Sequence, residues 1–319
     1  MSRLPVRHYC TYFDSHYLAR GLVLHQSLEE QSEGDFLLYV LCLDDRTHGV
    51  LDGLDRHTIV PVRLSDVEAW DPDLLKAKGN RSLVEYYFTL SPVFPLYVLE
   101  HFKCEIVTYL DADLMFFSSP EAIFEELGGR SILITEHRFS DELMRKGFLK
   151  SGRFNVQCQC FRKDEVGYSC LYRWREQCLA WCYDRHEGGK FADQKYLDDW
   201  PGLYGEDLVV SRHPGIGLAP WNVANVKLGM ENGRWQVNGR SLVFYHFHGL
   251  RNVFGSLYRL GLAPYDVRGT GSVKNLYTTY IKKMRGIQMN DSHVDQRFGR
   301  NVFRLIVGGI KSRDLGYFA

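Results

Sequence analysis

The stretch IVTYLDADLMFF, residues 106–117, places two carboxylates where the pattern otherwise predicts a buried strand. An apolar, β-branched run leads into Asp111 and Asp113, and a second apolar run follows at once. Burying an ionised carboxylate without a partner is very costly. We therefore expect the pair to lie at a strand end, to bind a cation, or both, with a turn or a capped helix start as the alternative.

The segments on either side of this stretch alternate between strand and helix patterns. Strands are predicted at residues 6–13, 36–43, 58–64, 105–110, 131–135, 154–161 and 242–247. Helices are predicted at residues 17–28, 83–102 and 164–184. Pro61 marks its strand as an edge strand, whereas Pro92 and Pro95 predict a kink or two pieces in the second helix. This alternation predicts a doubly wound, mostly parallel α/β sheet, which binds ligands beyond the carboxyl ends of its strands.

Composition excludes several classes of protein. Lys+Arg and Asp+Glu are both 39 in 319 residues, so the chain lacks the basic field of a nucleic-acid binder. The sequence contains neither a GxGxxG dinucleotide motif after its first strand nor a P-loop. No apolar stretch approaches the roughly twenty residues of a membrane-spanning helix, and MSRLPVRHYCTYF lacks the apolar segment of a signal peptide. We therefore expect a cytoplasmic protein.

The eight cysteines are typical of reduced thiols in a chain of this length. Cys158 and Cys160 would share one face of a strand. Cys178, Cys182 and His186 have helical i, i+4, i+8 spacing, which leaves a zinc site open. Buried thiols on a packed helix are the favoured interpretation, since no CxxC pair accompanies them.

Several motifs together resemble a known family. YLDADLMFFSSPEAIFEEL is similar to the signature region of GT-A-fold glycosyltransferases, most closely those similar to glycosyltransferase family eight. The segments CTYFDSHYLARGLVLHQSL, FNVQCQCF, FADQKYLDDW, LAPWNVAN and YHFHG also match this family in order, over residues 6–251. RSLVEYYFT, CYDRHEGGKFADQKYLDDWP and FYHFHGLR resemble bacterial transferases of surface-polysaccharide synthesis, of the lipopolysaccharide or capsule type. The resemblance implies a Rossmann-like GT-A fold.

The resemblance also implies a metal site. Asp111 and Asp113 would bind Mn²⁺ or Mg²⁺ together with the phosphates of a sugar nucleotide, and His246 would be the third metal ligand. A lone histidine at a strand end is more often structural, so only its family position favours His246. His248, two residues on, is the lesser candidate ligand.

Further residues correspond to the family's donor site. Asp193 and Gln194 form its catalytic pair beside the reacting sugar, although Asp193 could instead be a helix N-cap. Asn155 corresponds to an asparagine that contacts the donor, and Gly249 lets the backbone approach the phosphates. The family's lysine is replaced by Asn252, so Arg251 is the candidate phosphate ligand.

Two residues are expected to bind the nucleoside. Asp14 follows the first strand, where such enzymes often hold the base or ribose. Tyr86 begins a helix near the nucleotide, where it could stack on the base, but core packing is an equally good interpretation. Arg81 could contact phosphate or lie on the surface.

The chain changes character towards its end. We expect a catalytic domain at residues 1–255 and a helical, basic amphipathic extension at 256–319. From residue 274 onward its cationic residues are Lys274, Lys282, Lys283, Arg285, Arg297, Arg300, Arg304, Lys311 and Arg313. Such a helix can lie on the inner face of the cytoplasmic membrane as a peripheral contact, or pack on the catalytic domain or on a second subunit of a homodimer.

These observations predict a metal-dependent glycosyltransferase of the hexosyltransferase type. The donor would be a nucleoside-diphosphate sugar, UDP-linked, and the acceptor a glycan or a lipid-linked molecule. Retention of configuration is implied by the resemblance only, and Asp193 could act as the base of an inverting enzyme. A sugar-nucleotide hydrolase or nucleotidyltransferase could use the same metal site, and a non-catalytic nucleotide- or glycan-binding protein could have kept the fold.

Overall fold

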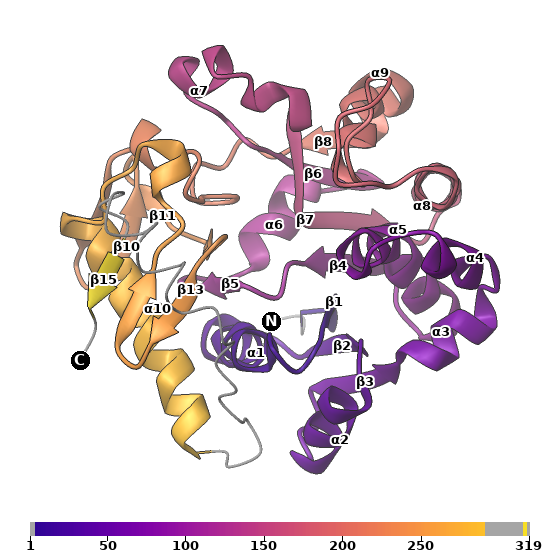
Figure 1. The fold of residues 1–319 in the computed structure, drawn as a ribbon, viewed down its shortest axis with the longest axis horizontal. Coiled ribbons are helices and arrows are strands. Elements are labelled where there is room, and N and C mark those ends of the chain that lie inside the picture. The colour runs from indigo at the N-terminus through magenta and orange to yellow at the C-terminus, as the bar shows by residue number, and fades with distance from the viewer. Residues whose placement is uncertain (1–3, 291–314, 318–319) are drawn as a thin grey trace.

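The computed structural model describes residues 4–290 and 315–317, and its centre is a seven-stranded sheet (Figure 1). The strand order is β3-β2-β1-β4-β7-β6-β8. Their bounds are β1 (Arg7–Phe13), β2 (Phe36–Cys42), β3 (Ile59–Arg63), β4 (Ile106–Leu110), β6 (Ile132–Glu136), β7 (Phe154–Arg162) and β8 (Leu208–Val210). The pairs β1–β2, β1–β4, β2–β3 and β6–β8 are parallel, whereas β7 runs antiparallel to β4 and β6. The predicted mostly parallel α/β sheet is confirmed.

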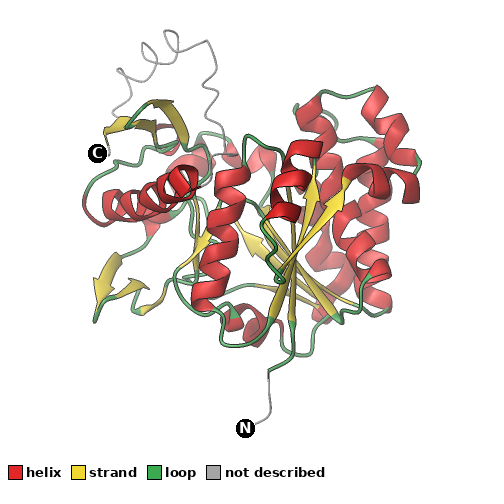
Figure 2. Cartoon of the chain, turned by 90° about the horizontal axis from the view of Figure 1, so that it is seen from below, coloured by secondary structure: helices red, strands yellow, loops and turns green. Residues whose placement is uncertain are grey.

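Helices cover both faces of this sheet (Figure 2). They are α1 (Leu18–Gln31), α2 (Asp45–Gly53), α3 (Leu64–Trp70), α4 (Asp73–Gly79), α5 (Leu83–His101), α6 (Glu121–Leu127), α7 (Asp141–Arg145), α8 (Glu165–Ala180), α9 (Trp200–Tyr204) and α10 (Gly271–Asn290). Five 3₁₀ turns are described: η1 (Phe148–Ser151), η2 (Gln194–Asp199), η3 (Gly205–Asp207), η4 (Val223–Asn225) and η5 (Ala263–Tyr265). One apolar cluster joins α5 and α8 to the sheet, and a second joins α1 and α6 to its other face. The sheet is thus buried on both sides, as the continuous apolar run of β2 predicts.

Two predicted helices differ from expectation. Helix α5 is continuous over 19 residues although it contains Pro92 and Pro95, so the predicted division into two pieces is wrong. Its start is fixed by a capping box between Ser82 and Glu85, and most of its remaining length is buried, so tertiary packing outweighs the hydrogen bonds that the prolines remove. Helix α8 ends at Ala180, because the chain turns extended at Trp181.

Smaller antiparallel sheets follow the central one. β5 (Leu114–Phe116) pairs with β12 (Phe244–His246). A second sheet contains β9 (Leu228–Glu231), β10 (Arg234–Val237) and β11 (Arg240–Ser241), and a third contains β13 (Arg251–Phe254), β14 (Leu257–Arg259) and β15 (Leu315–Tyr317). Of these short strands, β12 and the apolar strand β5 after the two aspartates were expected, and the others were not predicted. The short length of each leaves little periodicity to detect.

The C-terminal helix α10 packs against α1. Its apolar residues Tyr277, Tyr280 and Ile281 are fully buried together with Phe247, so in the described part of this helix the apolar face contacts the rest of the chain. The division at residue 255 stays a prediction, although β13 and β14 pair across it. The cationic residues beyond 290 lie outside the described residues. Among the described helices, none is long and apolar enough to cross a membrane.

Candidate metal centre and donor site

The two aspartates follow β4 directly, at the carboxyl end of a central strand. Backbone pairing then brings a distant histidine to them: β5 continues from Asp113 and pairs with β12, so that His246 lies opposite Leu114. The amide of Phe247 donates to the carbonyl of Asp113 at 3.0 Å, and the amide of His246 donates to Leu218 at 2.8 Å. Backbone hydrogen bonds therefore hold the segments that carry these three side chains next to each other.

The three side chains converge on one point. His246 Nε2 lies 3.0 Å from Asp113 Oδ1 and 3.7 Å from Asp111 Oδ2. One ligand atom from each residue lies within 4.8 Å of the other two, which is close enough for all three to hold one ion. In residues 4–290, no other group of three His, Cys, Asp or Glu side chains meets this criterion. The predicted set of three candidate ligands is thus brought together by the fold.

The electrostatics show why a cation fits there. Burial raises the pKa of Asp111 to about 6, and the neighbouring charge of Asp113 contributes to the increase. Burial would also raise the pKa of Asp113, but the charge and hydrogen bond of His246 outweigh it and hold this pKa well below its usual range. Conversely, burial would lower the pKa of His246, yet Asp113 and Asp111 raise it. Two adjacent carboxylates need positive charge, which a proton on His246 or a divalent cation can supply.

The chemistry of the donor set fits a divalent cation. Carboxylate oxygens suit Mg²⁺ and Mn²⁺, whereas an imidazole nitrogen is better suited to a transition metal. Tyr109 donates its hydroxyl to Asp111 Oδ1 at 2.9 Å, which orients this carboxylate and leaves Oδ2 facing His246. Asp111, Asp113 and His246 can therefore hold one divalent metal ion.

Asp193 lies beside this cluster. Its side chain is 6% exposed, and Asp193 occupies the N-cap position of the 3₁₀ turn η2 without a side-chain capping hydrogen bond. Burial raises the pKa of Asp193 to about 7, a hydrogen bond to Ser91 opposes this, and the charge of Asp111 adds to it. The charge of Asp111 therefore acts on the Asp193 carboxyl.

Gln194 and Asn155 are joined to each other. Asn155 Nδ2 donates to Gln194 Oε1 at 3.3 Å, and Gln194 Nε2 donates to the carbonyl of Ser151 at 2.8 Å. Asn155 is 9% exposed and lies on β7, the strand next to β4. The structure therefore joins Gln194, at the start of η2, to Asn155 on the strand that borders the cation cluster.

The structure supports one of the two residues expected to bind the nucleoside less well than the other. Tyr86 is 1% exposed and donates its hydroxyl to Glu68 at 2.7 Å, so core packing describes it and stacking on a base does not. Burial raises the pKa of its neighbour Tyr87 to about 12, and the charge of Asp14 contributes, so Tyr87 is the tyrosine that lies near Asp14. Asp14 itself follows β1 and accepts from the amide of His16 at 3.0 Å.

The phosphate candidates lie after β12. Gly249 has φ +76°, a conformation that favours glycine, and a Cβ there would lie 3.3 Å from the Cα of Gly261. Arg251 is exposed at the start of β13. Burial raises the pKa of Tyr17, the charge of Asp113 adds to this increase, and the charge of Arg251 opposes it. Arg81 is half-buried, and its guanidinium donates to the carbonyls of Cys178 and Leu179 at the end of α8.

The zinc alternative is not supported. All eight cysteines lie in the described residues, are buried, and form no disulfide. Helix α8 ends before Cys182, and His186 is exposed and stacks on Phe191 at 4.5 Å, so the three residues do not share a helix face. Cys158 and Cys160 belong to the same apolar cluster, which confirms their shared face.

Two residues near the cluster were missed by the sequence analysis. Trp221 packs edge-on against His246 and His248, with centroids 5.2 and 5.5 Å apart, although its segment was quoted only as a motif. Gln157 contacts His246 at 3.0 Å. The side-chain amides at positions 155, 157 and 159 interrupt an otherwise apolar strand, and this pattern could have indicated a role for Gln157. His248 is exposed and does not join the group of three candidate ligands.

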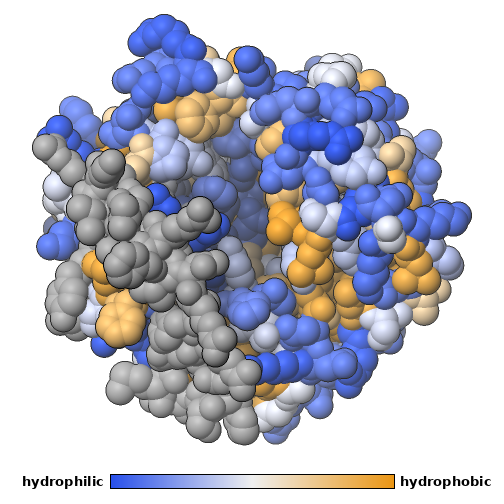
Figure 3. All heavy atoms as spheres, viewed as in Figure 1, coloured by the Kyte–Doolittle hydropathy of each residue, from blue (hydrophilic) through white to orange (hydrophobic). Residues whose placement is uncertain are grey.

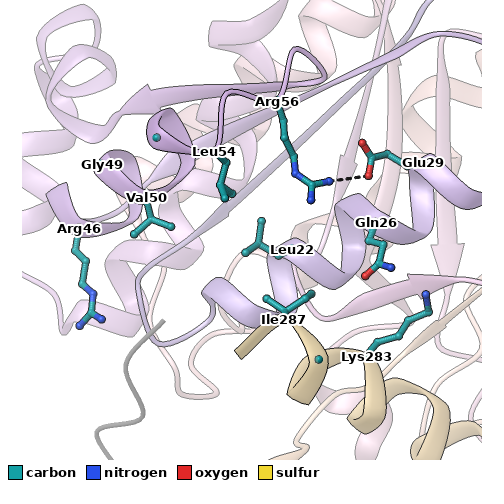
Figure 4. A pocket seen from close by; sticks show the side chains of 12 residues that line it. Leu22, Gln26, Glu29, Arg46, Gly49, Val50, Leu54, Arg56, Lys283 and Ile287 are labelled. Carbon is teal, nitrogen blue, oxygen red and sulfur yellow. Dashed lines mark hydrogen bonds and ion pairs between the residues drawn. The ribbon is translucent and has the colours of Figure 1, made fainter. Parts of the chain in front are cut away.

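Figure 3 shows a hollow near the middle of the face seen in Figure 1, with hydrophilic residues at its floor. A separate cavity of about 930 Å³ lies between α1, α2 and the end of α10 (Figure 4). Its lining includes Leu22, Ile287 and the ion pair of Arg56 with Glu29 at 2.9 Å, and none of the three candidate ligands.

Solved structures with the same architecture are glycosyltransferases. The galactosyltransferase LgtC, solved in complex with donor and acceptor sugar analogs, aligns at a TM-score of 0.57 and 14% identity, covering 88% of this chain and 95% of LgtC. The glycosyltransferase GlyE of Streptococcus pneumoniae TIGR4 aligns at a TM-score of 0.51 and 12% identity, covering 91% of this chain and 64% of GlyE. The fold is therefore that of the GT-A glycosyltransferases, as the motifs predicted.

Sequence comparison places the chain more narrowly. The uncharacterized protein YfnD of Bacillus subtilis (strain 168) is 31% identical over 281 residues, which are 87% of this chain and 88% of YfnD. The uncharacterized protein YfnF of the same strain is 34% identical over 254 residues, which are 77% of this chain and 82% of YfnF. The chain belongs to the family of YfnD and YfnF. No protein-family model matches it.

Proposed function

We propose that this protein is a metal-dependent glycosyltransferase. It moves a hexose from a nucleoside-diphosphate sugar, UDP-linked, to a glycan or lipid-linked acceptor, with retention of configuration. The observation that carries the proposal is the convergence of Asp111, Asp113 and His246 at the carboxyl end of β4 in a GT-A fold. LgtC, the similar structure, is described with donor and acceptor sugar analogs.

The metal would supply charge where the reaction needs it. Breaking the bond between the sugar C1 and the diphosphate leaves negative charge on the phosphate oxygens, which a bound cation stabilises as it forms. Asp111, Asp113 and His246 would hold that cation, since His246 Nε2 lies near both carboxylates. The mixed oxygen and nitrogen set favours Mn²⁺ over Mg²⁺.

The chain's other residues would position the two substrates. Asp193, whose pKa is raised to about 7 by burial, can donate or accept a hydrogen bond near neutral pH and so hold a sugar hydroxyl. Gln194, held by Asn155 and Ser151, would lie at the reacting sugar face. In the retaining reaction that the family resemblance implies, the departing phosphate takes the acceptor's proton. Arg251 and the backbone at Gly249 would contact the diphosphate.

Thermal-shift measurements test the donor site directly. UDP, GDP, CDP and ADP sugars are added with and without Mn²⁺ to the wild type, to Asp113→Ala and to the exposed control Asp73→Ala. A ligand that binds only the folded state raises its stability. We expect stabilisation by UDP sugars that requires Mn²⁺, persists in Asp73→Ala and is lost in Asp113→Ala. The absence of any nucleotide-dependent shift in the wild type would refute the donor-site assignment.

Turnover separates transfer from hydrolysis. The stabilising nucleotide sugar is incubated with the wild type and Mn²⁺, with and without a mixture of glycan acceptors, and the released nucleoside diphosphate is measured. We expect release to depend on acceptor. Equal release without acceptor would identify a sugar-nucleotide hydrolase instead.

A further inference from the structure

Gln157 contacts His246 on the side of the ring that is opposite the two aspartates. It lies on β7, is fully buried, and its Oε1 is 3.0 Å from His246 Nδ1. This ring nitrogen is the one that faces away from the aspartates, since Nε2 is the atom 3.0 Å from Asp113. Gln157 therefore touches a candidate metal ligand without reaching the metal position itself.

Neighbouring hydrogen bonds assign the orientation of the Gln157 amide. The carbonyl of Asn155 can only accept, so the Thr135 hydroxyl, 3.3 Å away, donates its hydrogen to it. The Thr135 oxygen then accepts from Gln157 Nε2 at 3.5 Å. Consequently the opposite end of the amide, Oε1, faces His246, and an acceptor at this place requires a hydrogen on Nδ1.

This arrangement determines which histidine nitrogen can bind a metal. A neutral imidazole with its hydrogen on Nδ1 carries its lone pair on Nε2, which points at Asp113 and Asp111. We propose that Gln157 is a positioning residue that holds His246 in this tautomer and ring orientation, ready for a divalent cation. The inference rests on the cation site of the proposed function and deepens it.

The same residue connects the cation cluster to the proposed sugar site. The backbone amide of Gln157 donates to Asn155 Oδ1 at 2.9 Å, which turns Asn155 Nδ2 towards Gln194 Oε1. Thus one strand position orients His246 through its side chain and Asn155 through its backbone. A side-chain substitution at Gln157 removes the first of these contacts and leaves the second.

The strand also supplies a matched control. Gln159 is two residues further on β7, fully buried like Gln157, and within the described structure its amide oxygen and nitrogen have no hydrogen-bond partner. The two glutamines share strand, side-chain length, side-chain chemistry and burial. They differ in their contact with His246.

The experiment measures Mn²⁺ binding alone, by electron paramagnetic resonance and calorimetry, on full-length protein. Gln157→Met removes the acceptor at similar size, Gln159→Met is the control, and Gln157→Glu keeps an acceptor for Nδ1–H. Loss of an outer hydrogen-bond partner typically weakens metal binding about 10- to 100-fold, and we expect this for Gln157→Met. Gln159→Met and Gln157→Glu should stay within about threefold of the wild type, well below that effect.

Thermal melting without metal is recorded for each variant, so that a general loss of stability is separated from a loss of affinity. Wild-type affinity in Gln157→Met, or an equal loss in Gln159→Met, would overturn the inference. If Gln157→Met does not fold, Gln157→Glu decides, because a loss of affinity there contradicts the acceptor role. A wild type that binds no Mn²⁺ would overturn the cation site as well, whereas Mn²⁺ binding without a nucleotide-sugar shift would overturn only the proposed function.

Discussion

Two of the carboxylate sites in the described structure have different partners. Asp71, between α3 and α4, is 3% exposed and is bound by two nitrogens of Arg175 on α8, with Nε 2.6 Å from Oδ2. Asp111 and Asp113 lie together at the end of β4, and in the described structure no lysine or arginine forms an ion pair with either. Their partner is His246, which can give its proton up.

The difference separates a structural charge from a functional one. A bidentate guanidinium satisfies its carboxylate permanently, because arginine cannot lose its proton in a protein. A carboxylate pair whose counter-charge is a removable proton can exchange that proton for a metal ion. The comparison predicts that the Asp71 pair contributes to stability alone, and that the β4 pair governs binding.

The largest effect is expected at the structural pair. Arg175→Met would leave Asp71 buried without its partner, which typically costs about 3–5 kcal/mol of the free energy of unfolding. Urea denaturation would measure the loss, and Mn²⁺ affinity should be unchanged. The double variant Asp71→Asn/Arg175→Met should recover part of the stability. A stability loss confined to the metal-bound protein would contradict the distinction.

Asp113→Asn should change Mn²⁺ affinity strongly and stability little, the reverse of Arg175→Met. Removing a direct ligand is expected to lower Mn²⁺ affinity by at least about 100-fold, beyond the range typical of an outer partner. The unfolding free energy without metal should change far less than in Arg175→Met. Calorimetric titration checks the affinity, with Asp73→Asn as the exposed control. Unchanged Mn²⁺ binding would return Asp113 to a structural role.

Asp193 is a third buried carboxylate, and the pH dependence of stability tests its environment. Its folded pKa is raised to about 7 from 3.8, so ionising this buried carboxyl costs stability as pH rises through that window. The stability of Asp193→Asn relative to the wild type should therefore increase from pH 4 to pH 8. The increase should be about 1–4 kcal/mol, since one pKa unit corresponds to about 1.4 kcal/mol. Denaturation at both pH values gives the difference, and a constant difference would mean that the carboxyl is not desolvated.

The smallest effect is expected where an ion pair is exposed. Arg56 and Glu29 are 2.9 Å apart, but their side chains are 45% and 37% exposed. Arg56→Met should change the free energy of unfolding by less than about 1 kcal/mol, and less still at high salt. A loss as large as that of Arg175→Met would show that burial does not decide the value of these pairs.

The sequence predicted the central sheet because its strands are long and apolar. β1, β2, β4 and β7 each form a run that periodicity identifies, and the two aspartates mark where β4 ends. The strands around His246 are three residues long, so its approach to Asp113 could be inferred only from the resemblance. Local patterns carry little information on such pairings between distant segments.

Other differences have equally local causes. Tyr86 and Tyr87 are adjacent on α5, and no pattern tells which of the two turns inward, so the choice of Tyr86 was wrong. The prolines of α5 are tolerated because the surrounding core packs the helix, a tertiary effect that propensity does not include. The side-chain contact of Gln157 depends on the register between β7 and β4, which the sequence leaves open.

The pairing of β5 with β12 has a consequence for synthesis on the ribosome. All seven strands of the central sheet precede residue 211, whereas His246 comes from a strand made later. Since chains fold from the N-terminus as they emerge, the sheet can assemble before its metal ligand has been translated. A chain terminated just before residue 244 would keep the segments of the sheet and both aspartates, yet lack the third ligand. The complete set of three cation ligands can therefore form only after β12, the last strand of the site, has been translated.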